Sequence, residues 1–130
     1  MLRGKPPKPK TRKELGRIAE EHAARHLESR GYRIRERNFR TRGGEVDIIA
    51  EHRGALAFVE VRARTSSDFM SPLESVTTTK QRRITRAANT YISVRERRER
   101  VMRYDVVEVF LTPEGRVRRV DVTQGAFQGG

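Results

Sequence analysis

Two segments separated by only three residues alternate aliphatic and charged side chains, and this pattern constrains the fold more than any other part of the chain. They are residues 45–51 and 55–64, EVDIIAE and ALAFVEVRAR. Alternation with a period of two is typical of β-strands, whose successive side chains point to opposite faces of a sheet. The three-residue break HRG favours a hairpin, so we expect the two strands to pair antiparallel, with Asp47 close to Glu60.

The same period assigns each side chain to a face of the sheet. On the first strand Glu45 and Asp47 share one face, and Val46 and Ile48 point to the other. On the second strand the face of Glu60 also carries an arginine two residues later. Each strand is therefore expected to bury an aliphatic face and to present charge on the opposite one.

Helical and extended segments surround this pair. Thr11 and Glu14 form the pattern of a capping box, and apolar residues then recur at helical spacing until Gly31. A further strand, YRIRERNF, follows the helix and completes a three-stranded antiparallel meander. Residues 65–72 are polar and predict a loop, whereas the apolar spacing within residues 77–94 predicts a second amphipathic helix.

Two more strands end the chain, because MRYDVVEVFL and RVRRVDVT flank the turn at residues 112–115 after a charged connector at 95–100. The order helix-strand-strand-strand-helix-strand-strand predicts an α/β domain with a central mixed five-stranded sheet flanked by helices. A chain of 130 residues fits one domain, which we expect to span residues 14–123. Residues 1–13 carry six cations, three prolines and no acid, which predicts a disordered basic arm, and residues 124–130 are expected to fray.

Charge narrows the choice of partner. Twenty-nine Lys and Arg against 17 Asp and Glu leave a net charge of +12, and 24 of these cations are arginine, which suits forked contacts to phosphate. We therefore expect a nucleic-acid partner. The absence of cysteine excludes disulfide scaffolds, cysteine-ligated zinc sites and thiol catalysis, and it favours a cytoplasmic location. No apolar run reaches the roughly 20 residues of a membrane span, so a membrane partner is not expected.

Three carboxylates can meet in such a fold. Asp47 and Glu60, on neighbouring strands, supply hard oxygen ligands that suit Mg²⁺ or Mn²⁺. On the first helix Glu20 borders the apolar stripe and is expected to face the sheet, whereas Glu21 turns towards solvent. A metal held by acidic groups in a basic protein suits phosphodiester hydrolysis, because the metal activates water and stabilises charge on the phosphate.

A simpler interpretation remains open, because charged and aliphatic residues also alternate on an ordinary solvent-facing sheet. In that case Arg62 or Arg64 neutralises the neighbouring carboxylates across the strands. Glu45 is a candidate further ligand, but pairing with Arg42 or Arg62 is favoured. Asp105, on a separate later strand, is expected to pair with a neighbouring arginine rather than to join the metal.

The order of motifs resembles the bacterial YraN family. It consists of Gly16-x-x-x-Glu20, Arg37-Asn38, GEVDIIA at 44–50, FVEVR at 58–62, Lys80 at the start of the second helix and RYDVV at 103–107, and it covers about residues 14–122. The resemblance implies the restriction-endonuclease-like fold of the PD-(D/E)XK nuclease superfamily, similar to archaeal Holliday-junction resolvases. It also implies that Asp47 and Glu60 bind the metal. Glu20 then matches the first-helix glutamate of these nucleases, and Arg62 stands where they usually have lysine.

The function implied by this resemblance is a divalent-metal-dependent endonuclease of DNA, with Asp47, Glu60, Arg62 and Glu20 as catalytic residues. Branched or junction DNA as substrate, and a homodimer, follow only from the similarity to the resolvases. Arg62 departs from the pattern, because a guanidinium stays protonated and cannot become the base that activates water, although it can orient the nucleophile or stabilise phosphate charge. A non-catalytic nucleic-acid-binding module that kept the nuclease fold is therefore one alternative, and a structural accessory of a ribonucleoprotein is another.

Contacts to nucleic acid are expected around the first turn of the meander and on the second helix. Glycines before the carboxylates allow a backbone to approach closely, and arginines four residues apart on the helix form a cationic ridge off its apolar stripe. Superfamily members also often contact DNA at the start of that helix. The expected contact residues are Arg42, Gly43, Gly44, Lys80, Gln81, Arg82 and Arg86.

Overall fold

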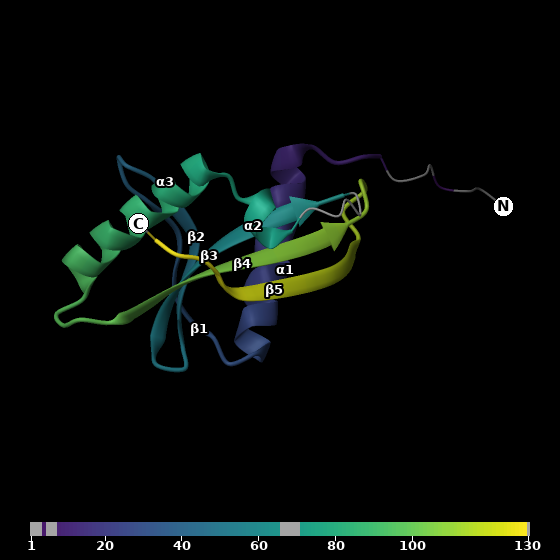
Figure 1. Ribbon diagram of the computed structural model, residues 1–130. Coiled ribbons are helices and arrows are strands. Elements are labelled where there is room, and N and C mark those ends of the chain that lie inside the picture. Colours follow the sequence, from purple (N-terminus) through teal and green to yellow (C-terminus); the bar gives the residue numbers. More distant parts are fainter. Residues whose placement is uncertain (1–3, 5–7, 66–70, 130) are drawn as a thin grey trace.

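A central five-stranded mixed sheet with helices on both faces forms the fold of the computed structural model, which describes residues 4, 8–65 and 71–129 (Figure 1). The strands lie side by side in chain order. The elements are α1 (Arg12–Ser29), β1 (Arg33–Arg40), β2 (Glu45–His52), β3 (Ala55–Arg64), α2 (Pro72–Ser75), α3 (Thr78–Arg95), β4 (Val101–Leu111) and β5 (Val117–Phe127). The predicted α/β class and the predicted order of the main elements are thus confirmed.

The direction of the strands follows from their connections. β1, β2 and β3 pair antiparallel, as the meander prediction states, and β4 and β5 form the predicted antiparallel hairpin. β3 and β4 pair in parallel from Ala55–Val101 to Arg64–Phe110. Because parallel neighbours need a long crossover connection, the segment that carries α2 and α3 has to pass across the sheet between them. This crossover places α3 beside the end of β3.

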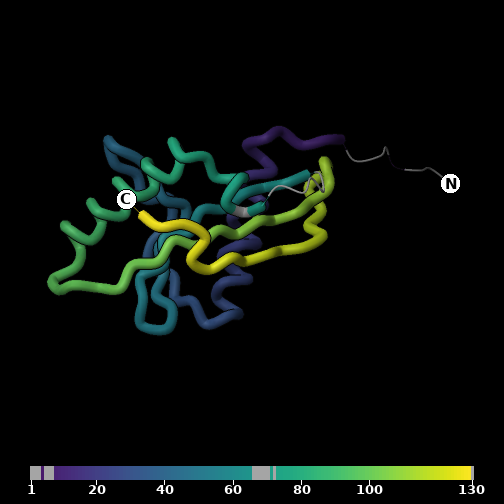
Figure 2. Tube along the Cα trace, viewed as in Figure 1, coloured from purple at the N-terminus to yellow at the C-terminus, as the bar shows by residue number. Residues whose placement is uncertain are grey.

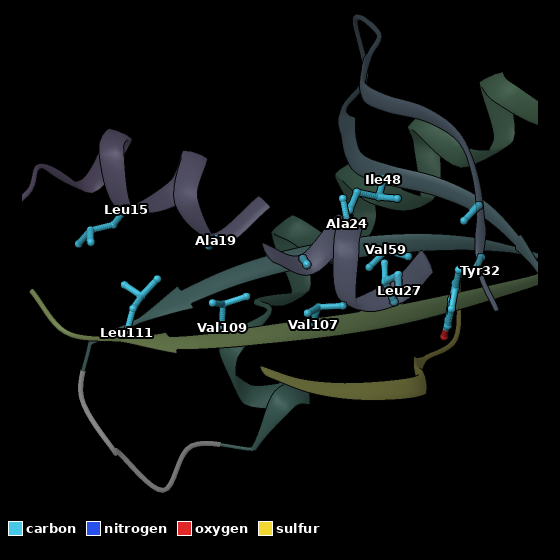
Figure 3. Packing of buried hydrophobic residues seen from close by; sticks show 13 residues of the cluster. Leu15, Ala19, Ala24, Leu27, Tyr32, Ile48, Val59, Val107, Val109 and Leu111 are labelled. Carbon is cyan, nitrogen blue, oxygen red and sulfur yellow. The ribbon is translucent and has the colours of Figure 1, made fainter. Parts of the chain in front are cut away.

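The two long helices cover opposite faces of the sheet (Figures 1 and 2). The buried stripe of α1, which includes Leu15 and Leu27, packs on Ile48, Val59 and Val107 of the sheet (Figure 3). The stripe of α3 packs against the opposite face, where the largest buried sheet residues are aromatic and aliphatic. The members of that second cluster from the sheet are Val46, Ile49, Leu56, Phe58, Tyr104, Val106 and Phe127.

Both faces of the central strands are therefore buried, and the prediction of a charged face opposite a buried one is wrong. Phe58 is fully buried on the α3 face, where the alternating pattern also places Glu60. The prediction that Val46 and Ile48 share a face is wrong as well, since Val46 packs on the α3 face and Ile48 on the α1 face. The alternation breaks at Asp47, immediately beyond the last β2–β3 pair, in which Ile48 lies opposite Val59.

The ends of the ordered chain also differ from the expected boundaries. Thr11 caps α1, so the helix begins inside the segment predicted as a disordered arm, and the Lys10 amide donates to the Pro113 carbonyl over 2.8 Å. Residues 1–3 and 5–7 of that arm lie outside the described residues. At the other end β5 extends to Phe127 rather than fraying from residue 124, because the Phe127 ring is buried at 5.0 Å from the Tyr104 ring.

The segment between β3 and α3 contains a helical turn that the sequence pattern does not predict. α2 occupies only four residues, capped by Ser71 and Glu74, whereas the loop prediction runs to residue 72. Four residues are too few to display helical periodicity. Residues 66–70 of this segment lie outside the described residues. Within the described part of the chain, no helix is both long enough and apolar enough to cross a membrane.

Candidate metal centre

Asp47 and Glu60 meet where β2 and β3 separate. Beyond the Ile48–Val59 pair, the Asp47 Oδ2 atom accepts a hydrogen bond from the Val61 backbone N–H over 2.8 Å. The carboxylate thus accepts a hydrogen bond from the β3 backbone at a position where β2 no longer pairs with it. This contact fixes the Asp47 side chain beside Glu60, and the predicted proximity of the two residues is confirmed.

Glu60 is a buried carboxyl, with only 4% of its surface exposed. Its burial, together with a hydrogen bond to Asp47 and the charge of that neighbour, raises the pKa of Glu60 to about 9. At neutral pH, without a cation, the Glu60 carboxyl is therefore protonated. An arrangement of this kind is costly for a fold and is typical of functional sites.

Glu20 of α1 approaches the pair, as predicted. Burial, followed by the charge of Asp47, raises the pKa of Glu20, and its Oε1 atom is buried without a hydrogen-bond partner among the described residues. Glu21, the next residue, is half exposed and pairs with Arg37 at 2.8 Å. The helical phase thus brings Glu20 to the sheet and leaves Glu21 at the surface.

Asn38 orients Glu20, a role that the sequence does not predict. Its side-chain amide lies close enough to the Glu20 carboxyl to lower the pKa of that group, and its backbone adopts the left-handed conformation at φ 54°. Asparagine tolerates this conformation better than most residues, although it still costs free energy relative to glycine. The signal available in the sequence is an asparagine, a poor strand former, inside an otherwise strand-like segment.

Lys80 is the cation that contacts the carboxylate pair. It lies in the first turn of α3, which Thr77 caps, and its Nζ atom lies 3.4 Å from Glu60 Oε1. Its side chain remains 38% exposed. The sequence predicts Lys80 only as a contact to nucleic acid. The link to Glu60 depends on the crossover that brings α3 over the end of β3.

Arg62 makes none of the ion pairs found among the described residues, and its Nε atom is buried without a hydrogen-bond partner. Arg64, the other candidate for neutralising the carboxylates, forms an ion pair with Glu108 at 2.5 Å. Glu45 pairs with Arg40 at 3.5 Å, so the favoured pairing with Arg42 or Arg62 is wrong. Residues on one face of adjacent strands compete for the same partners, and their spacing alone does not decide between them.

The glycines before β2 pack against the protein itself. A Cβ atom on Gly44 would lie 1.8 Å from the Arg83 carbonyl oxygen of α3, and one on Gly43 would lie 3.3 Å from Arg86 side-chain atoms. A backbone does approach this turn closely, as the sequence predicts, and it is the backbone of α3 at Arg83. The requirement for glycine at position 44 is explained by helix packing.

The remaining candidates for nucleic-acid contact lie on α3 and on the turn before β2. Arg42, Arg82 and Arg86 are exposed. The Gln81 side-chain amide instead donates to the Val76 carbonyl over 2.9 Å, which ties the first turn of α3 to the preceding loop.

Two clefts adjoin the carboxylates. One of about 240 Å³ is shared by Glu45, Lys80 and Arg83, and the other, of about 450 Å³, is shared by Glu20 and Asn38. Each cleft is lined by one neighbour of the buried pair, Lys80 in the first and Glu20 in the second.

A divalent cation fits this donor set. Among the described residues, no three His, Cys, Asp or Glu side chains are already gathered as a metal-binding group. Mg²⁺ nevertheless commonly uses one or two protein carboxylates and completes its shell with water. Asp47 and Glu60 supply those two, and the orphaned Glu20 Oε1 lies nearby. A cation would compensate both the burial of the Glu60 charge and its repulsion by Asp47, which together keep Glu60 protonated.

Comparison with known protein families assigns the sequence around these residues to a family. A profile of the family described as "Uncharacterised protein family UPF0102" matches residues 19–109, a range that includes Glu20, Asp47, Glu60 and Lys80. The chain belongs to this family. The predicted resemblance to YraN-like proteins is thereby confirmed.

Full-length relatives support the same assignment. The UPF0102 protein of Myxococcus xanthus is 41% identical over 94% of this chain and 95% of its own length. The UPF0102 proteins of Moorella thermoacetica and Dictyoglomus turgidum are 44% and 38% identical, over 90% and 88% of this chain and 98% of each relative. Because the name UPF0102 states no activity, the function has to follow from the site itself.

Proposed function

We propose that this UPF0102 protein is a divalent-metal-dependent endonuclease that hydrolyses phosphodiester bonds in DNA. The observation that carries the proposal is the buried Asp47–Glu60 pair, in which burial and like charge raise the pKa of Glu60 to about 9. A buried like-charged pair destabilises a fold unless a proton or a cation compensates it. A divalent cation bound by the two carboxylates would supply this compensation.

The residues around the pair support hydrolysis of a phosphodiester. Asp47 and Glu60 would hold Mg²⁺ or Mn²⁺, with Glu20 close by. When bound, such a cation activates water and offsets charge on the phosphate. Asp47 is held in position by the Val61 amide, and Lys80 brings a partly exposed ammonium next to the carboxylates. Lys80 can therefore contact the phosphate, and it supplies the ammonium that Arg62 does not supply on β3.

The surface near the pair supports binding to a polyanion. Arg42, Arg82 and Arg86 are exposed on the turn before β2 and on α3, the helix that also carries Lys80. Contacts of this kind provide affinity for phosphates without reading the bases. Branched DNA and a two-fold dimer remain part of the proposal through the resemblance to the resolvases.

Arg62 favours a second candidate function, a nucleic-acid-binding module without cleavage. Its guanidinium cannot act as a base, and its Nε atom lies buried without a hydrogen-bond partner among the described residues. In this alternative the carboxylate pair binds a cation that helps to hold phosphate, and no bond is broken.

Cleavage of labelled single-stranded, duplex, flapped and four-way-junction DNA with Mg²⁺ or Mn²⁺ separates the two candidates. The isosteric variants Asp47→Asn and Glu60→Gln should each lower the cleavage rate by about a hundredfold or more, because even changes around metal ligands cost roughly 10–100-fold. Glu21→Gln, which removes an exposed carboxylate of α1, is the matched control and should cut normally. Binding of DNA and of Mn²⁺ is measured in parallel.

Binding of DNA and Mn²⁺ without cleavage of any substrate would reject the nuclease and support the binding module. Cleavage that is as fast in both variants as in the wild type would show that the carboxylates are not the site. In that case the metal centre itself would be wrong.

A further inference from the structure

A second group of buried polar side chains lies at the other end of the sheet from the carboxylates. Tyr32, which precedes β1, stacks on His52 at the end of β2, with ring centroids 3.9 Å apart and planes inclined by 6°. Asp105 of β4 is fully buried beneath them. Asp47 and His52 are five positions apart on β2, which corresponds to about 16 Å along a strand. The two sites are therefore distinct.

Asp105 and Tyr32 have their hydrogen bonds satisfied within the protein. Arg103 donates from Nε to Asp105 Oδ1 and from Nη2 to Oδ2, each over 2.8 Å, which confirms the prediction that Asp105 pairs with a neighbouring arginine. The Gly125 amide adds a third donor at 3.0 Å, and the Tyr32 hydroxyl donates to Asp105 over 2.8 Å. Burial and this hydrogen bond raise the pKa of Tyr32 to about 12, so the hydroxyl stays protonated.

The proton on His52 can be assigned from its neighbour. Arg103 Nη2 lies 2.8 Å from His52 Nδ1, and a guanidinium can only donate, so Nδ1 is the acceptor. Burial and the charge of Arg103 lower the pKa of His52, which keeps the imidazole neutral. Its one proton is therefore on Nε2. No hydrogen-bond acceptor for this N–H is found among the described residues, although only 5% of the His52 surface is exposed.

This N–H belongs to a side chain that lines a cavity of about 350 Å³. The other lining residues are Arg30, Tyr32, Arg53, Val122 and Gln124. The lining contributes two guanidinium groups and an amide, and it contains no Asp or Glu. The cavity is thus surrounded by hydrogen-bond donors and positive charge, and its volume falls in the range of small-ligand sites.

We propose that this cavity binds a phosphate group, carried by a nucleotide or by a nucleic-acid strand, through the Arg30 and Arg53 guanidiniums and the Nε2–H of His52. Phosphate presents several acceptor oxygens to converging donors, and arginine matches its geometry with forked hydrogen bonds. The buried network of Tyr32, Arg103 and Asp105 fixes the His52 ring in place, so that this donor is preorganised.

The test follows the His52 imidazole by long-range ¹H–¹⁵N NMR without divalent cations, during titration with inorganic phosphate, a nucleoside 5′-monophosphate or an unphosphorylated DNA duplex. Saturable movement of the Nε2 resonance is expected. A response to inorganic phosphate and to the nucleotide at lower concentration than to DNA identifies a small ligand. A response to the duplex alone identifies a strand phosphate.

Two exposed variants test the donors without disturbing the buried network. Arg53→Asn keeps a residue that tolerates the φ of 49° at this position, and Arg30→Gln removes the other charge. Each should weaken binding about tenfold or more, because each removes a charge-assisted hydrogen bond to the phosphate. Arg116→Gln, an exposed arginine in the turn before β5, is the control and should bind like the wild type.

A His52 Nε2 resonance that none of the three ligands moves would overturn the inference, and so would unchanged affinity in both Arg30→Gln and Arg53→Asn. Asp47→Asn should retain phosphate binding at this cavity whether or not the chain cuts DNA. The outcome is thus separable from that of the proposed nuclease.

Discussion

Glu60 couples the stability of the protein to pH. Its pKa is about 9 in the folded chain and about 4.5 when the chain is unfolded, so between these values the folded state binds more protons. The free energy of unfolding should therefore fall as the pH rises from about 5 to 9 in the presence of a chelator. Glu60→Gln should flatten this dependence, and its stability at pH 8 should exceed that of the wild type. Urea denaturation across the pH range measures both effects.

A divalent cation should counteract the same loss of stability. Because Mg²⁺ favours the ionised pair, adding it should raise the midpoint of unfolding at pH 8 more than at pH 5 in the wild type. In Glu60→Gln the difference between the two pH values should shrink. A wild-type stability that increases through this pH range without metal would be incompatible with a buried, protonated Glu60.

At Asn38, backbone strain can be separated from the effect of the side-chain amide on the pKa of Glu20. Asn38→Gly keeps the left-handed backbone accessible and loses only the side-chain amide, whereas Asn38→Ala loses the amide and is strained at φ 54°. The alanine variant should therefore be less stable than the glycine variant, by about 1 kcal/mol in denaturant unfolding. In both variants NMR titration should show a higher pKa for Glu20. Equal stability of the two variants would contradict a conformational role for this position.

At the scale of residues, the sequence predicts the carboxylates better than their partners. Period-two and helical spacing were sufficient to place both Glu60 and Glu20 near Asp47. The positions of Lys80 and Asn38 relative to the carboxylates depend on how one element packs against another. The local spacing of residues in the sequence does not contain that information. The two-residue pattern also implied continuous pairing, whereas the Asp47 side chain replaces a backbone acceptor at the point where β2 leaves β3.

At the scale of elements, the turn before β2 should be sensitive to a single methyl group. Gly44→Ala would place its Cβ 1.8 Å from the Arg83 carbonyl, a backbone atom that can move only with α3. We expect a loss of about 3 kcal/mol or more in unfolding free energy, since overpacking typically costs 1–3 kcal/mol where side chains can adjust. Thermal or urea denaturation gives the measurement.

Gly43→Ala is the matched control for this change. The nearest atoms to its Cβ would be Cβ and Cδ of the exposed Arg86 side chain, both at 3.3 Å, and a small shift relieves this contact, so a loss below about 1 kcal/mol is expected. If both alanine variants were equally stable, the packing of this turn on α3 would not be the reason for glycine at position 44.

The elements themselves were predictable where they carry a period or a cap. The stripe and the Thr11–Glu14 capping box indicated α1, and alternation indicated the strands. The continuation of β5 was not predictable, because it depends on contacts such as the stacking of Phe127 on Tyr104, which are distant in sequence. The parallel pairing of β3 with β4, which buries both faces, likewise follows from the crossover rather than from the strand sequences.

At the scale of the whole molecule, the net charge of +12 predicts binding to DNA that weakens with salt. The logarithm of the association constant should fall linearly with the logarithm of salt concentration. If Arg82 and Arg86 contact phosphates, Arg82→Gln and Arg86→Gln should each reduce the slope by about 1. Fluorescence anisotropy with a labelled duplex measures this slope, and Arg116→Gln should leave it unchanged. An unchanged slope in the double variant would place the DNA on another surface.

The strand order also bears on how copies of the protein avoid one another. β1 and β5 are the edges of the sheet, where unpaired backbone groups can capture another strand and start aggregation. In β1, RIRERNFR, five of eight residues are charged and four of them are arginine. Each of these arginines pairs with a glutamate of the same chain, and a second strand would have to displace this charged layer before it could pair with the edge. The charged side chains of β1 thus act as gatekeepers against edge-to-edge aggregation.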